Sequence, residues 1–187
     1  TLCTAAVRQN GIALEHVPAA LCTPEICQIA VEQDPWALEF VPKKFCTINL
    51  CKMAVIRHPR TLMHVPKKFA KQELFETLVQ SRGIALKSVP ERYRTATICR
   101  MAVEQDARAL VYVPEALLTN DFLEPALGKN GRLLEYIPEF HKTKTNCRIA
   151  VEQNGLALEH VAFPLKFVEL CRIAVNDNGL ALEHVPW

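Results

Sequence analysis

The sequence has no long apolar run. Half of its 187 residues are hydrophobic, but charged residues make up 22 % and interrupt every segment. No run therefore reaches the roughly 18 to 20 apolar residues that a membrane-spanning helix needs, and no leader peptide is recognisable at the start. The hydrophobic content is too high for a disordered chain, so we expect a packed core.

The sequence also lacks the short motifs of catalysis and phosphate binding, such as G-x-S-x-G, H-E-x-x-H or a glycine-rich phosphate loop. Four histidines share one repeat position with aromatic residues: His16, His64, His160 and His184 alongside Phe40, Tyr112 and Tyr136. This exchange indicates a half-exposed planar side chain. Five glutamates recur in register, as in a solvated ridge: Glu15, Glu39, Glu135, Glu159 and Glu183. We predict that the protein is not an enzyme and needs no cofactor.

What the sequence contains instead is a tandem repeat. The segment CRIAVEQNGLALEHV at residues 147–161 returns at residues 171–185 as CRIAVNDNGLALEHV. A Val-Pro or Ile-Pro pair recurs every 24 residues, with Ala162 in place of one proline. A fixed period of this length is typical of solenoids. We predict an all-α solenoid forming one continuous array over residues 1–187, with repeats at 1–18, 19–42, 43–66, 67–90, 91–114, 115–138, 139–162 and 163–186.

The second repeat predicts two helices. Thr23 is an N-cap candidate and Pro24 suits the first helical turn, so a helix should begin there. Threonines recur at the same capping position: Thr47, Thr95, Thr119 and Thr143. The first helix should end at a glycine in the left-handed conformation, as at Gly11, whereas Pro35 must use another geometry. A short second helix follows, and an alanine that recurs on the first helix indicates close helix packing.

Most cysteines follow the repeat. Six share one position, where Phe75 and Leu123 stand in the other copies: Cys3, Cys27, Cys51, Cys99, Cys147 and Cys171. Exchange with Phe and Leu indicates a core position. Equivalent residues of stacked helices lie roughly 8 to 10 Å apart, which is too far for a disulfide. We therefore expect free buried thiols and an intracellular, reducing compartment.

Cys22 and Cys46 each stand five residues before a core cysteine, which makes two C-x4-C pairs. Structural zinc sites usually have C-x2-4-C spacing with a second pair nearby. The equivalent residues of the next repeats are Ala70, Arg94 and Leu118, without any trace of a ligand set. We predict no metal site.

Two copies depart from the pattern. The fourth has the bulky residues Phe75 and Leu78 at core positions, so its packing must open or its neighbours must shift. The sixth has Pro125 and Gly128 inside the first helix, where both are unfavourable. Residues 120–130 are the predicted kink or hinge, with neutral drift as the alternative.

The candidate binding residues lie in the N-terminal half. Residues 1–94 carry 13 Lys or Arg against 8 Asp or Glu, whereas residues 95–187 carry 9 against 12. Five of these cations stand at equivalent positions of consecutive repeats, so stacking of the repeats should align them into one stripe: Lys43, Lys44, Lys67, Lys68 and Arg92. Lys71 and Arg94 should support this stripe. Trp36 and Arg60 occupy the most variable repeat position and belong to residue types enriched at interface hot spots. The stripe is either a docking surface for an acidic partner or a solvated edge.

The pattern A-V-x-Q-N-G-x-A-L-E-x-V-P, seen in residues 6–18 and 150–161, resembles a family of tandem helical repeats known only as a domain of unknown function. Such repeats occur in bacterial effector-like proteins and in protists and algae. The resemblance implies an α-helical repeat fold and assigns no activity, cofactor or catalytic residue. The sequence begins and ends within the repeat pattern, so we expect it to come from a longer protein.

These observations favour a protein-interaction scaffold, because a solenoid offers an extended surface with variable positions on a fixed framework. A structural subunit of a large assembly is a related interpretation. The alternative from another class is single-stranded RNA binding, since helical repeats can read one base per repeat. The most variable position holds Ile or Leu in four of eight copies, and the net charge is only +2. Both features favour a protein partner over nucleic acid.

Overall fold

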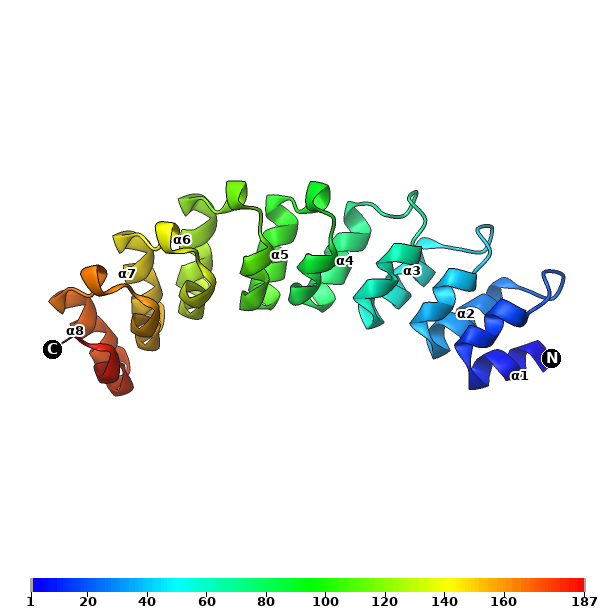
Figure 1. Cartoon of the computed structure of the whole chain (residues 1–187), viewed down its shortest axis with the longest axis horizontal. Coiled ribbons are helices and arrows are strands. Elements are labelled where there is room, and N and C mark those ends of the chain that lie inside the picture. The colour runs from blue at the N-terminus through cyan, green and yellow to red at the C-terminus, as the bar shows by residue number, and fades with distance from the viewer. Residues whose placement is uncertain (1, 187) are drawn as a thin grey trace. The chain divides into compact units, whose positions relative to one another are not determined.

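A computed structural model describes residues 2–186, in which helices are joined by short turns and no strand occurs (Figure 1). The α-helices of these residues are α1 (Leu2–Gln9), α2 (Pro24–Gln33), α3 (Ile48–Arg57), α4 (Gln72–Ser81), α5 (Ala96–Gln105), α6 (Asn120–Lys129), α7 (Lys144–Gln153) and α8 (Val168–Asp177). Each is followed by a six-residue 3₁₀-helix: η1 (Gly11–His16), η2 (Pro35–Phe40), η3 (Pro59–His64), η4 (Gly83–Ser88), η6 (Ala107–Tyr112), η8 (Gly131–Tyr136), η10 (Gly155–His160) and η12 (Gly179–His184). Short 3₁₀ turns precede the later α-helices: η5 (Glu91–Tyr93), η7 (Glu115–Leu117), η9 (Glu139–His141) and η11 (Phe163–Leu165).

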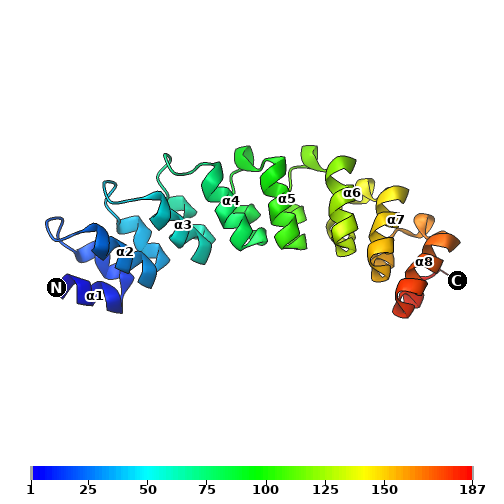
Figure 2. The same cartoon turned by 180° about the vertical axis from the view of Figure 1, so that it is seen from behind.

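The chain divides into two compact units, Thr1–Tyr93 and Arg94–Trp187. Within each unit, consecutive α-helices pack side by side and each contacts its own 3₁₀-helix, as Figures 1 and 2 show. The predicted all-α solenoid fold is therefore confirmed. A single array over residues 1–187 stays a prediction.

Threonine caps most of the helices for which the sequence predicted it. In four cases the hydroxyl oxygen accepts a hydrogen bond from the N–H three residues later: Thr23 from Ile26, Thr47 from Leu50, Thr95 from Ile98 and Thr143 from Asn146. Each bond satisfies one of the amides that a helix leaves unpaired at its start. Thr119 also stands at the N-cap position of its helix, but its side chain makes no such bond.

The glycine prediction is wrong in its mechanism. No glycine of the described residues has a positive φ. The α-helix ends at the preceding residue, for example Asn10 with φ −147° and ψ 111°, and Gly11 begins the 3₁₀-helix. The Asn10 side chain accepts a hydrogen bond from the Ile12 N–H over 3.0 Å. The extended asparagine thus ends one helix and caps the next, so a left-handed residue is not needed.

At Gly11 and Gly131 the next repeat packs directly against the glycine instead. A Cβ atom at Gly11 would overlap the carbonyl oxygen of Ala30, and one at Gly131 would overlap that of Ala150. Ala30 and Ala150 are themselves completely buried, which confirms that helices approach closely at the recurring alanine.

A side chain of the next repeat also binds Gly11 and, at the equivalent position, Gly155. The Gly11 N–H donates to Gln33 Oε1 over 2.6 Å, and the Gly155 N–H donates to Asp177 Oδ2 over 2.7 Å. The repeats are therefore held in register by polar as well as apolar contacts.

In the second repeat the direction of this hydrogen bond is reversed, so that the side chain of the next repeat donates and the backbone accepts. Pro35 has no N–H to donate. The next repeat carries Arg57 at the position of Gln33, and its guanidinium donates to the carbonyl oxygens of Val31 and Glu32. Loss of a donor in one repeat is thus matched by a donor in its neighbour.

The two irregular repeats keep their helices. Phe75 and Leu78 are both completely buried, and the Phe75 ring lies 4.7 Å from that of Tyr93. Helix α6 continues through Pro125 without interruption. Proline cannot donate to the carbonyl four residues earlier, that of Asp121. The Arg100 guanidinium donates to that oxygen over 3.4 Å, so a neighbouring helix supplies the missing bond.

Candidate interaction surface

The basic residues of the predicted stripe lie in three equivalent turns of the first unit. Lys43 and Lys44 follow η2, Lys67 and Lys68 follow η3, and Arg92 lies in η5 after η4. In each turn the amide of an aromatic residue donates over 2.8 Å to the proline carbonyl three residues earlier: Phe45 to Pro42, Phe69 to Pro66 and Tyr93 to Pro90. Each of the three turns therefore contains the same type of backbone hydrogen bond. The turns follow one another along an edge of the unit (Figure 1).

One cation in each turn lies over the ring of the next residue. The distances from the charged group to the ring centroid are 4.6 Å for Lys44 and Phe45, 4.6 Å for Lys68 and Phe69, and 4.9 Å for Arg92 and Tyr93. The cations are exposed, whereas the rings are half-buried. A cation–π contact at an exposed site contributes about 0.5 to 1 kcal/mol. It also restricts a flexible side chain, so each charge is held at the surface with less entropy to lose on binding.

These cations carry no internal counter-charge. Within residues 2–186, none of the five basic side chains in the three turns forms an ion pair. Basic residues elsewhere do: Lys52 pairs with Glu73, Lys129 with Glu104, Lys142 with Glu139, Arg148 with Glu152 and Arg172 with Glu169. The three turns therefore form an uncompensated positive edge, which we call the basic edge and define as Lys43, Lys44, Lys67, Lys68 and Arg92.

Two further predicted site residues have different surroundings. The Trp36 ring lies 5.8 Å from the rings of both His58 and His64, so much of its surface is used in packing between repeats. Arg60 is exposed and borders a shallow hollow of about 340 Å³ together with Met63 and Pro90. Arg60 is free to meet a partner, whereas Trp36 is half-buried.

The two residues expected to support the stripe, Lys71 and Arg94, lie in different units and differ in their contacts. Lys71 is exposed at the start of α4. Arg94 belongs to the second unit, and its guanidinium donates to the carbonyl oxygen of Tyr112 over 2.9 Å. Arg94 is therefore a structural residue and not part of the basic edge.

Sequence reasoning missed the aromatic half of the edge. Phe45, Phe69 and Tyr93 each follow a Lys or Arg directly, at an interval of 24 residues. That recurrence was the signal available in the sequence. Their contact with the cations depends on side-chain rotamers, which the repeat pattern does not specify.

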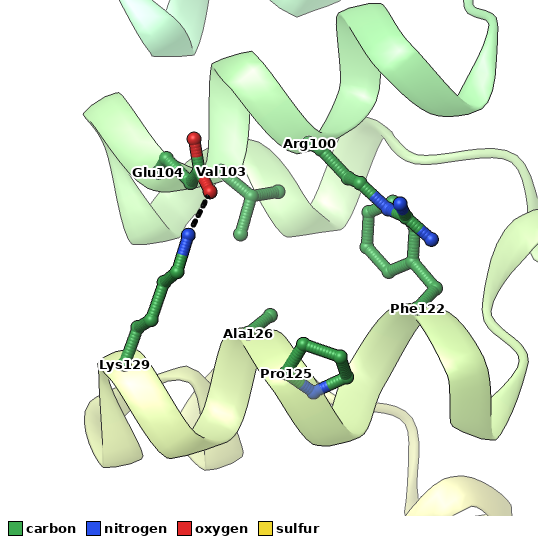
Figure 3. Close-up of a pocket in the computed structure, with 7 residues that line it drawn as sticks. All are labelled: Arg100, Val103, Glu104, Phe122, Pro125, Ala126 and Lys129. Atoms are coloured by element: carbon green, nitrogen blue, oxygen red, sulfur yellow. Dashed lines mark hydrogen bonds and ion pairs between the residues drawn. The ribbon is translucent and has the colours of Figure 1, made fainter.

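A hollow of about 150 Å³ lies between α5 and α6, as Figure 3 shows. The ion pair of Lys129 with Glu104 closes one end, and the Arg100 guanidinium lies 5.8 Å from the Phe122 ring centroid at the other. Pockets for small molecules are usually about 300 to 1,000 Å³. The hollow is too small for such a ligand, and its polar groups already pair with one another.

The cysteine side chains are free thiols, and those of the described core positions are buried except Cys3. Cys22 and Cys46 are buried too, each with its sulfur close to that of the next core cysteine. Among the residues that the structure describes, no three His, Cys, Asp or Glu side chains come together in a way that would hold a metal ion.

Residues 2–46 match the family model of a domain of unknown function, DUF4116. This part of the chain is therefore similar to an uncharacterised repeat family. The comparison with curated proteins found no match, and neither did the comparison with solved structures. In residues 2–186, every helix is too short or too polar to cross a membrane.

Proposed function

We propose that this protein is a non-enzymatic interaction scaffold whose basic edge docks an acidic surface of a protein partner. The observation that carries the proposal is the set of five exposed cations, three of them held on aromatic rings, with no carboxylate paired to them. Clustered charge of one sign steers the approach of an oppositely charged partner. Arg60 extends the edge as an exposed contact. A place within a larger assembly is consistent with this role.

The burial of the aromatic rings in the basic edge favours a protein partner over single-stranded RNA. Sequence-tolerant RNA binding depends on bases stacking on aromatic faces. Here the rings are half-buried and each has a cation over one face. The edge is therefore better suited to accept carboxylates than to stack bases.

Two further expectations belong to this proposal. We assign the repeats after residue 46 to the same uncharacterised family, because they keep the 24-residue period of the part that matches. We also infer a reducing, intracellular compartment, because the buried cysteines are free thiols.

The test uses poly-L-glutamate and poly-uridylate RNA as probes. The variant K43E/K44E/K67E/K68E should fold normally, because exposed charges contribute little to stability. It should bind poly-L-glutamate about tenfold or more weakly, because steering by a charge cluster is worth that much at low salt. The salt dependence should flatten as well. Fluorescence anisotropy over a salt titration measures both effects.

The matched control reverses four exposed cations of the second unit, K129E/R132E/R148E/R172E. The change in net charge is the same, so general repulsion is equal. Equal loss of binding in both variants would remove the basic edge as the site. Tighter and steeply salt-dependent binding to the RNA by the unmodified protein would replace the acidic partner with nucleic acid.

A further inference from the structure

The first unit contains two pairs of cysteine sulfurs in close contact. The Sγ atoms of Cys22 and Cys27 are 3.5 Å apart, and those of Cys46 and Cys51 are 3.6 Å apart. A disulfide bond is about 2.05 Å long, so closure needs an approach of only about 1.5 Å. Both pairs have the same geometry because both occupy the same place in consecutive repeats.

The helix start explains why the two sulfurs meet. Cys46 precedes the N-cap Thr47, whose hydroxyl oxygen accepts a bond from the Leu50 N–H. Cys51 lies one turn into α3, and its N–H donates to the Thr47 carbonyl. The cap therefore folds the preceding turn back over the helix, and the same contacts at Thr23 place Cys22 over Cys27.

Each pair has an outer and an inner sulfur. Cys22 and Cys46 retain 8 % and 6 % of their surface, whereas Cys27 and Cys51 are completely buried. Only a small reagent can reach such a site. The hydrogen bond from the Cys51 thiol, assisted by the nearby Lys68 ammonium, lowers the pKa of Cys46 to about 7. Burial and the Cys22 thiol raise the pKa of Cys27 to about 12. The outer Cys46 thus carries thiolate near neutral pH, in a protein region where the inner sulfurs stay protonated.

We propose that Cys46–Cys51 and Cys22–Cys27 are redox-active dithiol sites that hydroperoxides convert to disulfides. This property is independent of the basic edge as a docking surface. The outer thiolate attacks one oxygen of hydrogen peroxide, the O–O bond breaks, and the hydroxide that leaves becomes water on taking a proton. The outer cysteine becomes a sulfenic acid.

The inner cysteine completes the reaction. Its sulfur attacks the outer sulfur, the S–S bond forms, the S–O bond breaks, and the departing hydroxide takes the inner thiol proton and leaves as water. The two sulfurs together lose two electrons and the peroxide gains two. A small thiol reductant such as 2-mercaptoethanol reverses the change by two steps of thiol–disulfide exchange.

The second unit contains the matched comparison. Cys99, Cys147 and Cys171 occupy the same helical position as Cys27 and Cys51, but each thiol donates to a backbone carbonyl instead: that of Arg94, Lys142 and Lys166, at 3.6, 3.7 and 3.7 Å. No second sulfur stands at the position five residues earlier, so these cysteines have no resolving partner.

The experiment treats the folded chain with hydrogen peroxide, removes the peroxide, unfolds the protein in N-ethylmaleimide to block the remaining thiols and maps the peptides by mass spectrometry. The expected result is a loss of two hydrogens at each pair, with Cys99, Cys147 and Cys171 alkylated as thiols. Far-UV circular dichroism of the oxidised protein should be unchanged. Persistence of all four thiols under peroxide in the folded state would overturn the proposal, as would equal oxidation of Cys99.

Two variants locate the chemistry. Cys46→Ala, which copies Ala70 of the next repeat, should abolish the Cys46–Cys51 disulfide and leave Cys22–Cys27 oxidation unchanged. Cys51→Ser, which keeps a hydrogen-bond donor beside Cys46, should trap Cys46 as a sulfenic acid that dimedone labels, with no disulfide at that site. Dimedone labelling of Cys51 in the Cys46→Ala variant at the rate seen for Cys46 would contradict the assignment of the outer sulfur as the attacking group.

Discussion

The two units use the same repeat but differ at the residue five positions before the core cysteine. The first unit has Cys22, Cys46 and Ala70 there, whereas the second has Arg94, Leu118, Lys142 and Lys166. A second thiol gives the core cysteine a sulfur partner. A long cation instead reaches backbone or a carboxylate, as Arg94 does to Tyr112 and Lys166 to His184.

The two units also differ in how many of their cations are paired with carboxylates. The first unit places five of its cations in exposed turns where they form no ion pair, whereas five cations of the second unit pair with carboxylates: Arg108, Lys129, Lys142, Arg148 and Arg172. One framework thus supports a surface with available charge and a surface with compensated charge. The difference lies in exposed residues of the turns and of the outer helix faces, because the buried residues that set the framework stay similar.

Thiol reactivity should separate the units most strongly. Thiolate is the reacting species, so alkylation accelerates as pH rises through the pKa of each thiol. Cys46 should reach half its maximal rate near pH 7, the value that its pKa predicts. Burial raises the pKa of Cys99 to about 11, so Cys99 should be slower by about a hundredfold or more at pH 8. Timed iodoacetamide labelling with peptide mapping measures both rates. Rapid native labelling of Cys99 and Cys147 would mean that they are not core residues.

Removal of one core leucine should cost both units equally. Leu110 and Leu38 occupy the same position in the six-residue 3₁₀-helices η6 and η2, and each is 2 % exposed. Leu110→Ala and Leu38→Ala should each lower the free energy of unfolding by roughly 2 to 5 kcal/mol, as buried large-to-small changes do. Chemical denaturation gives the two values. Near-normal stability of either variant would place its leucine outside the core.

Glycine substitutions test the contact between repeats. Gly131→Ala should cost roughly 1 to 3 kcal/mol, because the new methyl overlaps the Ala150 carbonyl and the backbone has to shift. Gly179→Ala is the control, because nothing lies within 4 Å of a Cβ placed there. It should be neutral or slightly stabilising. Equal effects of the two substitutions in thermal unfolding would show that backbone conformation, and not packing, requires glycine.

Asn146→Leu should stabilise the second unit. Asn146 is completely buried where other repeats carry Ile, Leu or Phe, and its Oδ1 has no hydrogen-bond partner. Its Nδ2 does donate to the His141 carbonyl over 2.8 Å, and that bond would be lost. An unsatisfied buried group costs about 1 to 3 kcal/mol, so we expect a net gain of about 1 kcal/mol. The reverse change in the first unit, Leu50→Asn, is the control and should destabilise. A lower melting temperature for Asn146→Leu would show that the Asn146 bond is the larger effect.

Much of this architecture follows from the sequence alone. The 24-residue period defined the repeats, and the spacing of Thr, Pro and apolar residues placed the start and the buried face of α2 and its equivalents. The exchange of Cys with Phe75 and Leu123 identified a core position, and Phe75 and Leu123 are indeed buried. The stripe of cations was visible because register repeats a charge at each turn.

Tertiary structure decided the rest, because the deciding contacts join residues of different repeats or depend on side-chain rotamers. Glycine follows α1 because the Ala30 carbonyl occupies the space of a side chain, and no local pattern distinguishes that cause from a left-handed turn. The spacing of Cys46 and Cys51 made their contact conceivable, but only the capped turn brings the sulfurs to 3.6 Å. The number of cations in the stripe follows from the sequence, but only the structure shows that three of them lie over aromatic rings and that none forms an ion pair. Local sequence determines helices and period through short-range sterics and hydrogen bonding, whereas packing between repeats determines which small, polar and sulfur-containing residues meet.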